Sequence, residues 1–252
     1  MTVDPRCEPF TLPGTNGETI VAIHGFTGCP AHWRLVAPVL QEAGYTVVVP
    51  LLAGHGGTPA DLEEVTADDW VASVVDAARG HEGPVHLAGL SLGGLLAVMA
   101  ARPTAAATLT TINAPVKLRD RRALLLPLIA LIRPEIDHTD EPLPAVDEAA
   151  AELFFTYRRY PTRSAVQLLS LRRRALHAAR RLRRPATVIQ SRADETVDPS
   201  SGKILARALG PSTRLVWLER SIHNALLGLE RDRVARAILE QVTGESHDGH
   251  EL

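Results

Sequence analysis

The chain has 252 residues, a length compatible with one large domain or with two small ones. Hydrophobic residues make up 45% and charged residues 22% of the chain, and this balance excludes an intrinsically disordered protein. With 27 Lys and Arg against 29 Asp and Glu, the formal net charge is -2, so no global field would draw the protein onto nucleic acid or an anionic membrane.

Continuous apolar runs alternate along the chain with stretches of helical length. The runs are apolar on both faces, which is typical of buried parallel strands, and the stretches between them end at Gly or Pro. Strands are predicted over residues 19–24, 46–50, 85–88, 108–112, 186–190 and 214–218. Helices are predicted over residues 31–43, 66–79, 92–102, 199–209 and 230–242. This order predicts an α/β fold whose mostly parallel sheet carries helices on both faces.

Residues 116–185 interrupt this alternation with helical runs, several prolines and no convincing buried strand. We interpret them as an inserted helical cap, which leaves residues 1–115 and 186–245 as the core and residues 246–252 as a flexible tail. Residues 134–157 carry seven acidic side chains and no Lys or Arg, whereas residues 172–184 carry seven Arg. We expect these two segments to pair with each other; a basic patch for a phosphate or an anionic lipid surface is the alternative.

The segment Gly89-Leu90-Ser91-Leu92-Gly93 fits the G-x-S-x-G nucleophile elbow. In this motif a strained turn between a strand and a helix holds a serine hydroxyl clear of the sheet, and side chains at the two glycine positions would clash. The pattern alone is a weak signal, but here it directly follows a predicted strand and directly opens a predicted helix. Ser91 is therefore the candidate nucleophile.

A serine hydroxyl needs a histidine to take its proton and a carboxylate to orient that histidine. Open parallel sheets gather such residues at the carboxyl ends of their strands. Asp194 follows the predicted strand 186–190 and His223 follows the strand 214–218, so we expect both to converge on Ser91. Glu195 and Asp198, further along the same loop, are alternative acids.

Acyl transfer also needs two donors for the oxyanion. The backbone N–H of Leu92, directly after the nucleophile, is the first candidate. The N–H of Phe26 is the second, because it lies in a glycine-flanked loop directly after the first predicted strand.

Other residues with catalytic or metal-binding chemistry are expected to be structural. Four more histidines are expected to be hydrogen-bonded structural residues: His24, His55, His86 and His177. No histidine pair has the spacing of a zinc site with a Cys or carboxylate partner, and the two histidines of the tail are not expected to bind a metal.

Together these motifs resemble the α/β-hydrolases, most closely the small bacterial carboxylesterases and monoacylglycerol-lipase-like enzymes. The resemblance covers nearly the whole chain and is carried by residues 24–28, 50–56, 69–70, 89–94, 194 and 221–223. It implies an eight-stranded, mostly parallel sheet, a small helical cap, ester hydrolysis without a cofactor, and Ser91, Asp194 and His223 as the catalytic triad. Two departures concern the pocket beside the triad: Cys29 stands where the family often has serine, and Gly228 where it often has aspartate.

We therefore predict a serine carboxylesterase that hydrolyses short- to medium-chain esters or monoacylglycerols through an acyl-enzyme. A thioesterase, a lactonase or a perhydrolase would use the same triad, and a ligand-binding protein on the hydrolase fold is an alternative from another class. An apolar run of the cap is expected either to line the acyl pocket or to pack within the cap. This run contains Leu124, Leu125, Leu126, Ile129 and Ile132.

The N-terminal residues lack the basic start and the apolar run of a signal peptide, and no stretch reaches the ~18 uninterrupted apolar residues of a membrane span. The two cysteines, Cys7 and Cys29, are too few for a disulfide framework and are expected to be free thiols. We expect a cytoplasmic monomer or homodimer, without stable membrane insertion, whose partner is a small-molecule ester with an apolar acyl group and not a nucleic acid.

Overall fold

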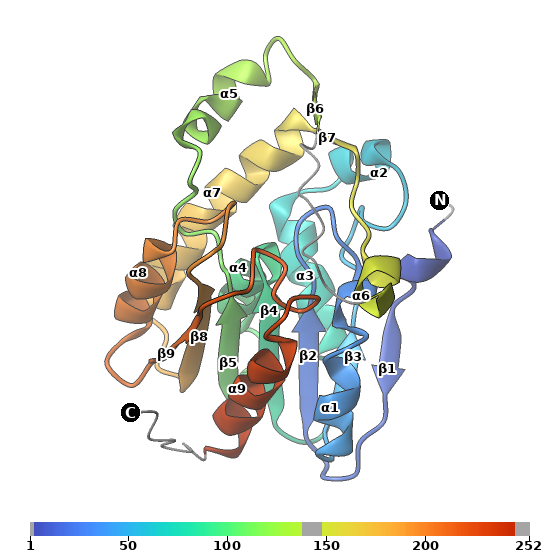
Figure 1. The fold of residues 1–252 in the computed structure, drawn as a ribbon, viewed down its shortest axis with the longest axis vertical. Helices are drawn as coiled ribbons and strands as arrows, with labels where there is room; N and C mark the ends of the chain where they lie inside the picture. Colours follow the sequence, from blue (N-terminus) through green and yellow to red (C-terminus); the bar gives the residue numbers. More distant parts are fainter. Residues whose placement is uncertain (1–2, 138–147, 245–252) are drawn as a thin grey trace.

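A seven-stranded sheet forms the centre of the molecule in the computed structural model, which describes residues 3–137 and 148–244 (Figure 1). Its strands lie in the order β1-β3-β2-β4-β5-β8-β9. They are β1 (Phe10–Leu12), β2 (Thr19–Ile23), β3 (Thr46–Val49), β4 (Val85–Leu90), β5 (Thr108–Ile112), β8 (Ala186–Ser191) and β9 (Arg214–Leu218). All pairs except β1 with β3 are parallel, which confirms the predicted mostly parallel sheet.

The described part of the sheet has one strand fewer than the eight that the resemblance implies. The chain before β2 contributes only β1, which is three residues long and pairs antiparallel with β3 at the edge. Pro9 and Pro13 flank it directly, and a proline has no N–H to donate to a strand ladder. The short N-terminal segment therefore forms one edge strand.

Helices cover both faces of the sheet, as predicted. Helices α1 (Ala37–Glu42) and α9 (Arg231–Thr243) lie on one face, whereas α3 (Ala67–Ala77), α4 (Leu92–Ala100) and α8 (Ser200–Leu209) lie on the other (Figure 1). Side chains of β2 alternate between the two layers, because successive residues of a strand point to opposite faces. Ile20 packs in the cluster that includes residues of α1 and α9, and Val21 packs with residues of α3 and α4.

The helix predicted over residues 31–43 is divided in two. A 3-10 turn, η2 (Pro30–Trp33), comes first, and α1 begins only at Ala37. Pro38 occupies the first turn of α1, the position where the missing N–H of proline costs no helical hydrogen bond. Proline placement therefore explains why one helical stretch became a turn followed by a short helix.

The region between β5 and β8 projects beyond the carboxyl ends of the strands (Figure 1). It contains η3 (Arg121–Leu125), α5 (Leu126–Ile129), β6 (Glu135–Asp137), α6 (Glu148–Leu153), β7 (Arg159–Pro161) and α7 (Thr162–Ala179). The pair of β6 and β7 was not predicted, because these strands are short and largely exposed and so carry no apolar run.

Helix α7 belongs by packing to the sheet layers as much as to the cap. Leu171, Ala175 and Ala179 are fully buried in the same apolar cluster as α3 and α4. The division at residues 116 and 185 into core and cap stays a prediction, and the tail at residues 246–252 lies outside the described residues.

The acidic and the basic segment of this region form ion pairs with other parts of the chain. Asp137 pairs with Arg133 and Arg159, while Arg174 of α7 pairs with Asp68 of α3. Within residues 3–137 and 148–244, therefore, no ion pair joins the acidic to the basic segment; Asp140, Glu141 and Asp147 lie outside that part.

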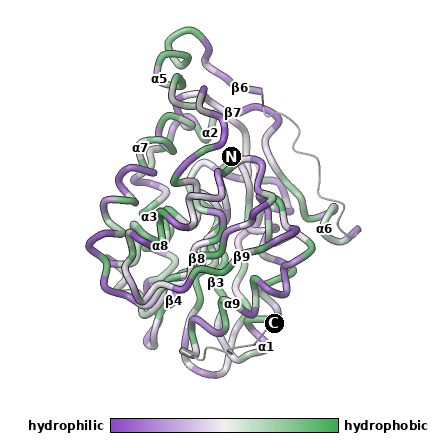
Figure 2. Tube along the Cα trace, turned by 60° about the vertical axis from the view of Figure 1, so that its left-hand side comes forward, coloured by the Kyte–Doolittle hydropathy of each residue, from purple (hydrophilic) through white to green (hydrophobic). Residues whose placement is uncertain are grey.

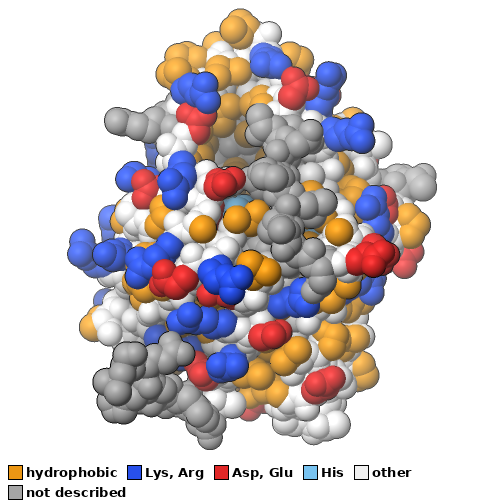
Figure 3. Space-filling view, in the orientation of Figure 1, with side chains coloured by type: hydrophobic (Ala, Val, Ile, Leu, Met, Phe, Trp, Pro, Cys, Tyr) orange, Lys and Arg blue, Asp and Glu red, His pale blue; other side chains and the backbone are white. Residues whose placement is uncertain are grey.

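The basic segment and the apolar outer side of α5 form separate areas of the surface. Basic side chains gather over α7 and α8, on the left of Figure 3. Around α5 the chain is apolar (Figure 2), and three side chains there are largely exposed. These are Leu128, Leu131 and Ile132. None of the described helices combines the length and the apolar character needed to cross a bilayer.

Candidate active site

Ser91 occupies a tight turn between β4 and α4. Its backbone is left-handed, with a φ of 54°, and its N–H donates to the carbonyl oxygen of Ile112 at 2.8 Å. A Cβ on Gly89 would lie 2.1 Å from the Gly93 carbonyl oxygen, and a Cβ on Gly93 would lie 2.3 Å from that of Ile23. Neither position has room for a side chain, so the two glycines of the motif are required by close backbone contacts.

The structure brings Ser91, His223 and Asp194 into one hydrogen-bonded chain. His223 Nε2 lies 2.9 Å from Ser91 Oγ, and His223 Nδ1 lies 2.9 Å from Asp194 Oδ2. With the imidazole proton on Nδ1, the serine hydroxyl donates to Nε2 and the imidazole donates to the carboxylate. Ser91 is 9% exposed and Asp194 is fully buried, so the chain of bonds runs from the pocket surface into the protein.

Asp194 is the carboxylate in contact with His223, and the two alternative acids lie elsewhere. Asp198 forms an ion pair with Lys117 at 2.6 Å, and the hydrogen bond from Lys117 holds the pKa of that carboxyl well below its ordinary range. Glu195 lines the pocket. Asp194 Oδ1 accepts the backbone N–H groups of Thr196 and Val197 at 2.9 and 2.8 Å, which leaves Oδ2 directed at the imidazole.

The four histidines predicted from the sequence to be structural take no part in the hydrogen bond between Ser91 and His223. His24 accepts the N–H of Leu52 on Nε2, and His86 lies between Thr108 and Glu18. His55 contacts the carbonyl oxygen of Ala53, and His177 is exposed on α7.

The loop after β2 lies directly beside the nucleophile. A Cβ on Gly25 would be 3.3 Å from Ser91 Cβ, so the backbone of this loop approaches the serine closely. The Phe26 ring makes edge contacts with Trp70 and Tyr160, with ring centroids 5.9 and 5.4 Å away. Leu92 begins α4 immediately after Ser91. Phe26 and Leu92 thus lie in the two segments adjoining the nucleophile, and their roles as oxyanion donors stay a prediction.

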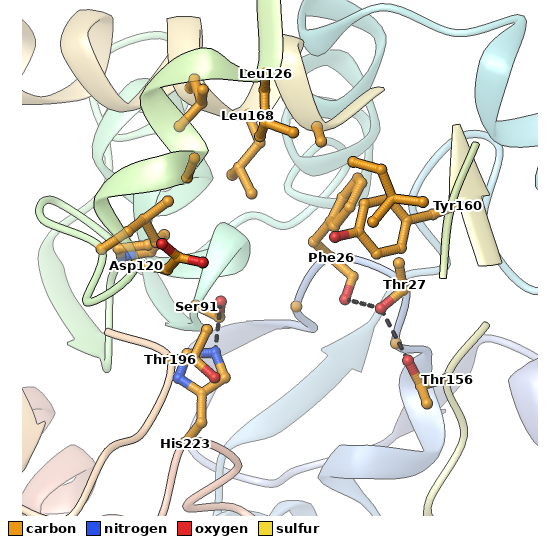
Figure 4. A pocket seen from close by; sticks show the side chains of 18 of the residues that line it. Phe26, Thr27, Ser91, Asp120, Leu126, Thr156, Tyr160, Leu168, Thr196 and His223 are labelled. Atoms are coloured by element: carbon orange, nitrogen blue, oxygen red, sulfur yellow. Dashed lines mark hydrogen bonds between the residues drawn. The ribbon is translucent and has the colours of Figure 1, made fainter. Parts of the chain in front are cut away.

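Ser91 opens into a cavity of about 670 Å³ between the carboxyl ends of the strands and the cap. Leu126 of α5 and Leu168 of α7 lie on the cap side of Ser91, and Phe26 and Tyr160 form a neighbouring wall (Figure 4). Ile129 lines the same cavity. This part of the cavity wall is therefore aliphatic and aromatic, whereas charged side chains, among them Asp120, Arg122 and Arg133, line other parts of the cavity.

Only part of the apolar run predicted in the cap faces this cavity. Leu126 and Ile129 line the cavity, in agreement with the expectation that this run lines a pocket. Leu125 and Ile132 are exposed on the outside, at 51% and 87%. The side chain of Leu124 lies outside what the structure describes. Successive residues of a helix point to different sides, and a continuous apolar sequence does not indicate which of them face the cavity.

A polar region of the same cavity lies on the side of the loop after β2. Thr27 Oγ1 lies 2.9 Å from Thr156 Oγ1, which joins this loop to the cap (Figure 4). His32 Nε2 lies 3.0 Å from the Phe155 carbonyl oxygen, and Asn224 Nδ2 lies 3.3 Å from His32 Nδ1. Burial lowers the pKa of His32 to about 4, so this imidazole is neutral at neutral pH.

Comparison with known proteins agrees with this geometry. Residues 20–237 match the model of a family described as the alpha/beta hydrolase family. The chain belongs to that family. This α/β-hydrolase is 31% identical over 241 residues to the thermostable monoacylglycerol lipase of Bacillus sp. (strain H-257), covering 92% of this chain and 93% of the relative.

Further relatives of this α/β-hydrolase carry names from the same class. It is 25% identical over 239 residues to a carboxylesterase of Bacillus subtilis (strain 168), covering 92% of this chain and 95% of that one. A solved structure from work on the metagenome-derived lipolytic enzymes LipS and LipT superposes with a TM-score of 0.87 at 30% identity, covering 97% of this chain and 100% of that one. The monoacylglycerol lipase of Paleococcus ferrophilus shares the fold, with a TM-score of 0.80 at 16% identity over 98% of this chain and 100% of that one.

Sequence reasoning missed Glu230, which holds the loop that carries His223. Its carboxylate accepts the backbone N–H groups of Glu219, Arg220 and Ser221, and the hydroxyl of Ser221. Burial raises the pKa of Glu230, but these backbone hydrogen bonds outweigh it and hold the pKa below its ordinary value. In the sequence, Glu230 is a single Glu at the predicted start of the last helix, and such a residue is equally consistent with an exposed position.

The two departures of this α/β-hydrolase from the family pattern have a structural context. A Cβ on Gly228 would lie 3.2 Å from Ser221 Oγ, and Glu230, two residues on, supplies a carboxylate to that hydroxyl. Cys29 is fully buried beside Cys7, and both are free thiols, as predicted.

Sequence reasoning also missed Asn113, a fully buried amide that contacts the backbone of His223. In the sequence, the feature that could have drawn attention to Asn113 is its position as a polar residue directly after a predicted strand. Among the residues that the structure describes, no group of three or more His, Cys, Asp or Glu is placed to hold a metal ion.

Proposed function

We propose that this α/β-hydrolase is a serine carboxylesterase that hydrolyses esters of short to medium apolar acyl chains, monoacylglycerols included. The observation that carries the proposal is the chain of hydrogen bonds from Asp194 through His223 to Ser91 at the floor of a mostly apolar cavity. The similarity to a named monoacylglycerol lipase and a named carboxylesterase over nearly the whole chain supports it.

In the proposed first step, Ser91 Oγ attacks the ester carbonyl carbon while its proton moves to His223 Nε2. The carbonyl oxygen becomes an oxyanion, which the backbone N–H groups of Phe26 and Leu92 stabilise; one such donor is typically worth about 10²–10³-fold in rate. The tetrahedral intermediate then expels the alcohol, which takes the proton from His223 and leaves an acyl-Ser91 ester.

Water repeats the sequence in the second step. It gives a proton to His223 Nε2 and attacks the acyl-enzyme, and collapse of that intermediate releases the carboxylic acid and returns the proton to Ser91. Asp194 stays ionised throughout, holding the imidazole proton on Nδ1 and stabilising the imidazolium that forms. The two backbone N–H groups that donate to Asp194 Oδ1 hold the carboxylate in place.

The cavity suggests how the two halves of the substrate lie. The acyl chain would extend along the apolar wall formed by Leu126, Ile129 and Leu168, where its burial is favourable. The alcohol would lie toward the polar side, where Thr27 and Asn224 offer hydrogen-bonding groups. A glycerol moiety fits that side chemically, which is why monoacylglycerols are included.

We also propose a cytoplasmic location and a monomer or homodimer as the active form. Two buried free thiols support a reducing compartment, because disulfides persist mainly in oxidising ones.

The proposal is tested by fluorophosphonate labelling together with hydrolysis of p-nitrophenyl esters from acetate to laurate. We expect the wild type to label at one serine and to prefer a medium-chain ester, and Ser91→Ala to lose labelling and about 10⁶-fold in kcat, as when a catalytic serine is removed. Ser170→Ala, at an exposed position of α7, is the matched control and should behave as wild type.

A wild type that neither labels nor hydrolyses any of these esters would contradict an esterase. Faster turnover of an acyl thioester than of the matched oxygen ester would reassign the protein as a thioesterase with the same triad.

A further inference from the structure

Asn113 lies at the carboxyl end of β5, in the middle of the sheet. Strand β5 pairs with β4, which leads to Ser91, and with β8, which leads to the Asp194 loop. Asn113 is fully buried, and its φ of 48° places its backbone in the left-handed region. Asn tolerates this conformation better than most residues. The chain therefore turns sharply at a residue that stands between the nucleophile and the acid.

All four hydrogen-bonding positions of the Asn113 amide are occupied. Oδ1 accepts the backbone N–H of Ser191 at 2.7 Å and Nε2 of Gln190 at 3.2 Å. Nδ2 donates to Ser191 Oγ at 2.9 Å and to the backbone carbonyl oxygen of His223 at 2.8 Å. One side chain thus links the end of β8, the strand that leads to Asp194, to the backbone of the residue whose imidazole contacts Ser91.

The end of β5 contacts the backbone of all three elements of the triad. The carbonyl oxygen of Ile112 accepts the N–H of Ser91, and the N–H of Asn113 donates to the carbonyl oxygen of Ile189 in β8. The loop that carries His223 comes after β9, the edge strand next to β8, and has no strand pairing of its own with β5. The side chain of Asn113, directly after β5, reaches this loop through hydrogen bonds to the carbonyl oxygens of Ile222 and His223.

We propose that Asn113 is a positioning residue, which holds the backbone of His223 at the distance from Ser91 and Asp194 that proton transfer requires. This inference rests on the proposed function, because it assigns Asn113 a task within that mechanism. Glu230 holds residues 219–221 of the same loop, and Asn113 holds the next two, Ile222 and His223, through their carbonyl oxygens.

The chemistry of the site explains why the residue is an asparagine. Three acceptors, Ser191 Oγ and the carbonyl oxygens of Ile222 and His223, lie on the Nδ2 side, and two donors lie on the Oδ1 side, so the side chain must both accept and donate. An ionised aspartate of the same shape only accepts, and it would place an oxygen against the His223 carbonyl oxygen. The buried amide is therefore matched to its partners on both sides.

The experiment compares Asn113→Asp and Asn113→Ser with wild type on a p-nitrophenyl ester. Each kcat is expressed per active site titrated with a fluorophosphonate, so that loss of folded protein lowers the titre and leaves the rate per site unchanged. We expect kcat to fall about 10²-fold, the typical effect of displacing a catalytic group by about 1 Å, with KM within about 2-fold.

A second readout distinguishes positioning from general destabilisation. In wild type the proton that His223 Nδ1 donates to Asp194 should give a strongly deshielded proton resonance, and Asn113→Asp should weaken or shift it. Thr111→Val is the matched control on the same strand: its Oγ1 is buried and has no hydrogen-bond partner in the described part of the chain, so the change should alter neither kcat nor this resonance.

Ser191→Ala separates the bonds that Asn113 Nδ2 donates, because it removes the hydroxyl acceptor and leaves the bonds to the carbonyl oxygens of Ile222 and His223. We expect its kcat to stay within about 5-fold of wild type, since only the bond between neutral groups is lost. Unchanged kcat per titrated site and an unchanged resonance in both Asn113 variants would overturn the inference while the esterase stands. A wild type without labelling or turnover would instead overturn the proposed function.

Discussion

The floor and the wall of the cavity are built in different ways. On the floor, Ser91, Asp194 and Asn113 are nearly or fully buried at the ends of sheet strands, and backbone groups hold each of them. In the cap wall, α5 presents Leu126 to the cavity and leaves Leu128 64% exposed on its outer side. We infer from this difference that the proposed chemistry depends on the backbone that holds the floor, whereas the proposed choice of substrate depends on individual side chains of the cap.

This contrast has an energetic origin. When a buried hydrogen bond in the floor is lost, the polar group that remains has no partner, neither protein nor water, at a cost of about 1–3 kcal/mol. A catalytic group that shifts by about 1 Å also loses much of its effect on the rate. A cap side chain that is partly exposed has fewer neighbours to disturb, and surface substitutions usually change stability by less than about 0.5 kcal/mol. Changes in the floor should therefore be far more damaging than changes of similar size in the cap.

The largest expected effect concerns the acid. Asp194→Asn should lower kcat by about 10⁴-fold, because an amide at this position favours the wrong imidazole tautomer. Asp198→Asn should change kcat by less than about 2-fold, since that carboxylate pairs with Lys117 and does not touch His223. Hydrolysis of p-nitrophenyl butyrate checks both variants, and a severe effect of Asp198→Asn with a mild one of Asp194→Asn would reassign the acid.

The next effect concerns acid stability, which depends on buried histidines in the segments that follow β2 and β3. Burial lowers the pKa of His32 and of His55 to about 4 and that of His24 well below its ordinary value. Between pH 6.5 and 4 the unfolded chain binds protons that the folded chain excludes, so stability falls as pH falls, by about 1.4 kcal/mol per pH unit for each histidine. Above pH 6.5 both states are neutral at these sites and the contribution disappears.

Thermal unfolding across this pH range measures the effect. His55→Gln should flatten the dependence by about one proton. A slope that is the same in wild type and in His55→Gln would show that His55 is not the group that titrates.

A smaller effect is expected in the wall. Ile129→Ala shortens a side chain that lines the cavity, and it should lower kcat/KM about 10-fold for a decanoate ester relative to acetate, within the range for lost methylene contacts. Ile132→Ala is the matched control three residues further on, where the side chain is 87% exposed. If both variants changed the chain-length profile equally, the cavity would not be the acyl site.

The smallest effect is expected where the cap helix α7 contacts the sheet layer through an ion pair. Arg174 and Asp68 lie 2.5 Å apart, but their side chains are 42% and 71% exposed. A double-mutant cycle with Arg174→Ala and Asp68→Ala should give a coupling energy below about 1 kcal/mol in urea unfolding. A coupling of several kcal/mol would mean that this pair fastens the two regions together.

The sequence indicated that the residues of the floor would lie together, for reasons visible in particular residues. Asp194 and His223 each follow a strand in a parallel sheet, so their neighbours along the chain already placed them at the same edge. The elbow around Ser91 could be recognised because its glycines are required by contacts a few residues away. Asn113 and Glu230 escaped prediction because their partners lie 77 to 110 and 9 to 11 residues away in the sequence, and no local pattern marks such partners.

By itself, then, the sequence determined the parallel sheet, the elbow and the order of the three residues that the structure brings together, because local periodicity and strand ends carry that information. Tertiary structure alone decided that Leu126 faces the cavity while Leu125 and Ile132 face outward, that β6 pairs with β7, and that one edge strand precedes β2. Those outcomes depend on which surfaces meet when the layers pack, and contacts between distant segments leave no signature within either segment.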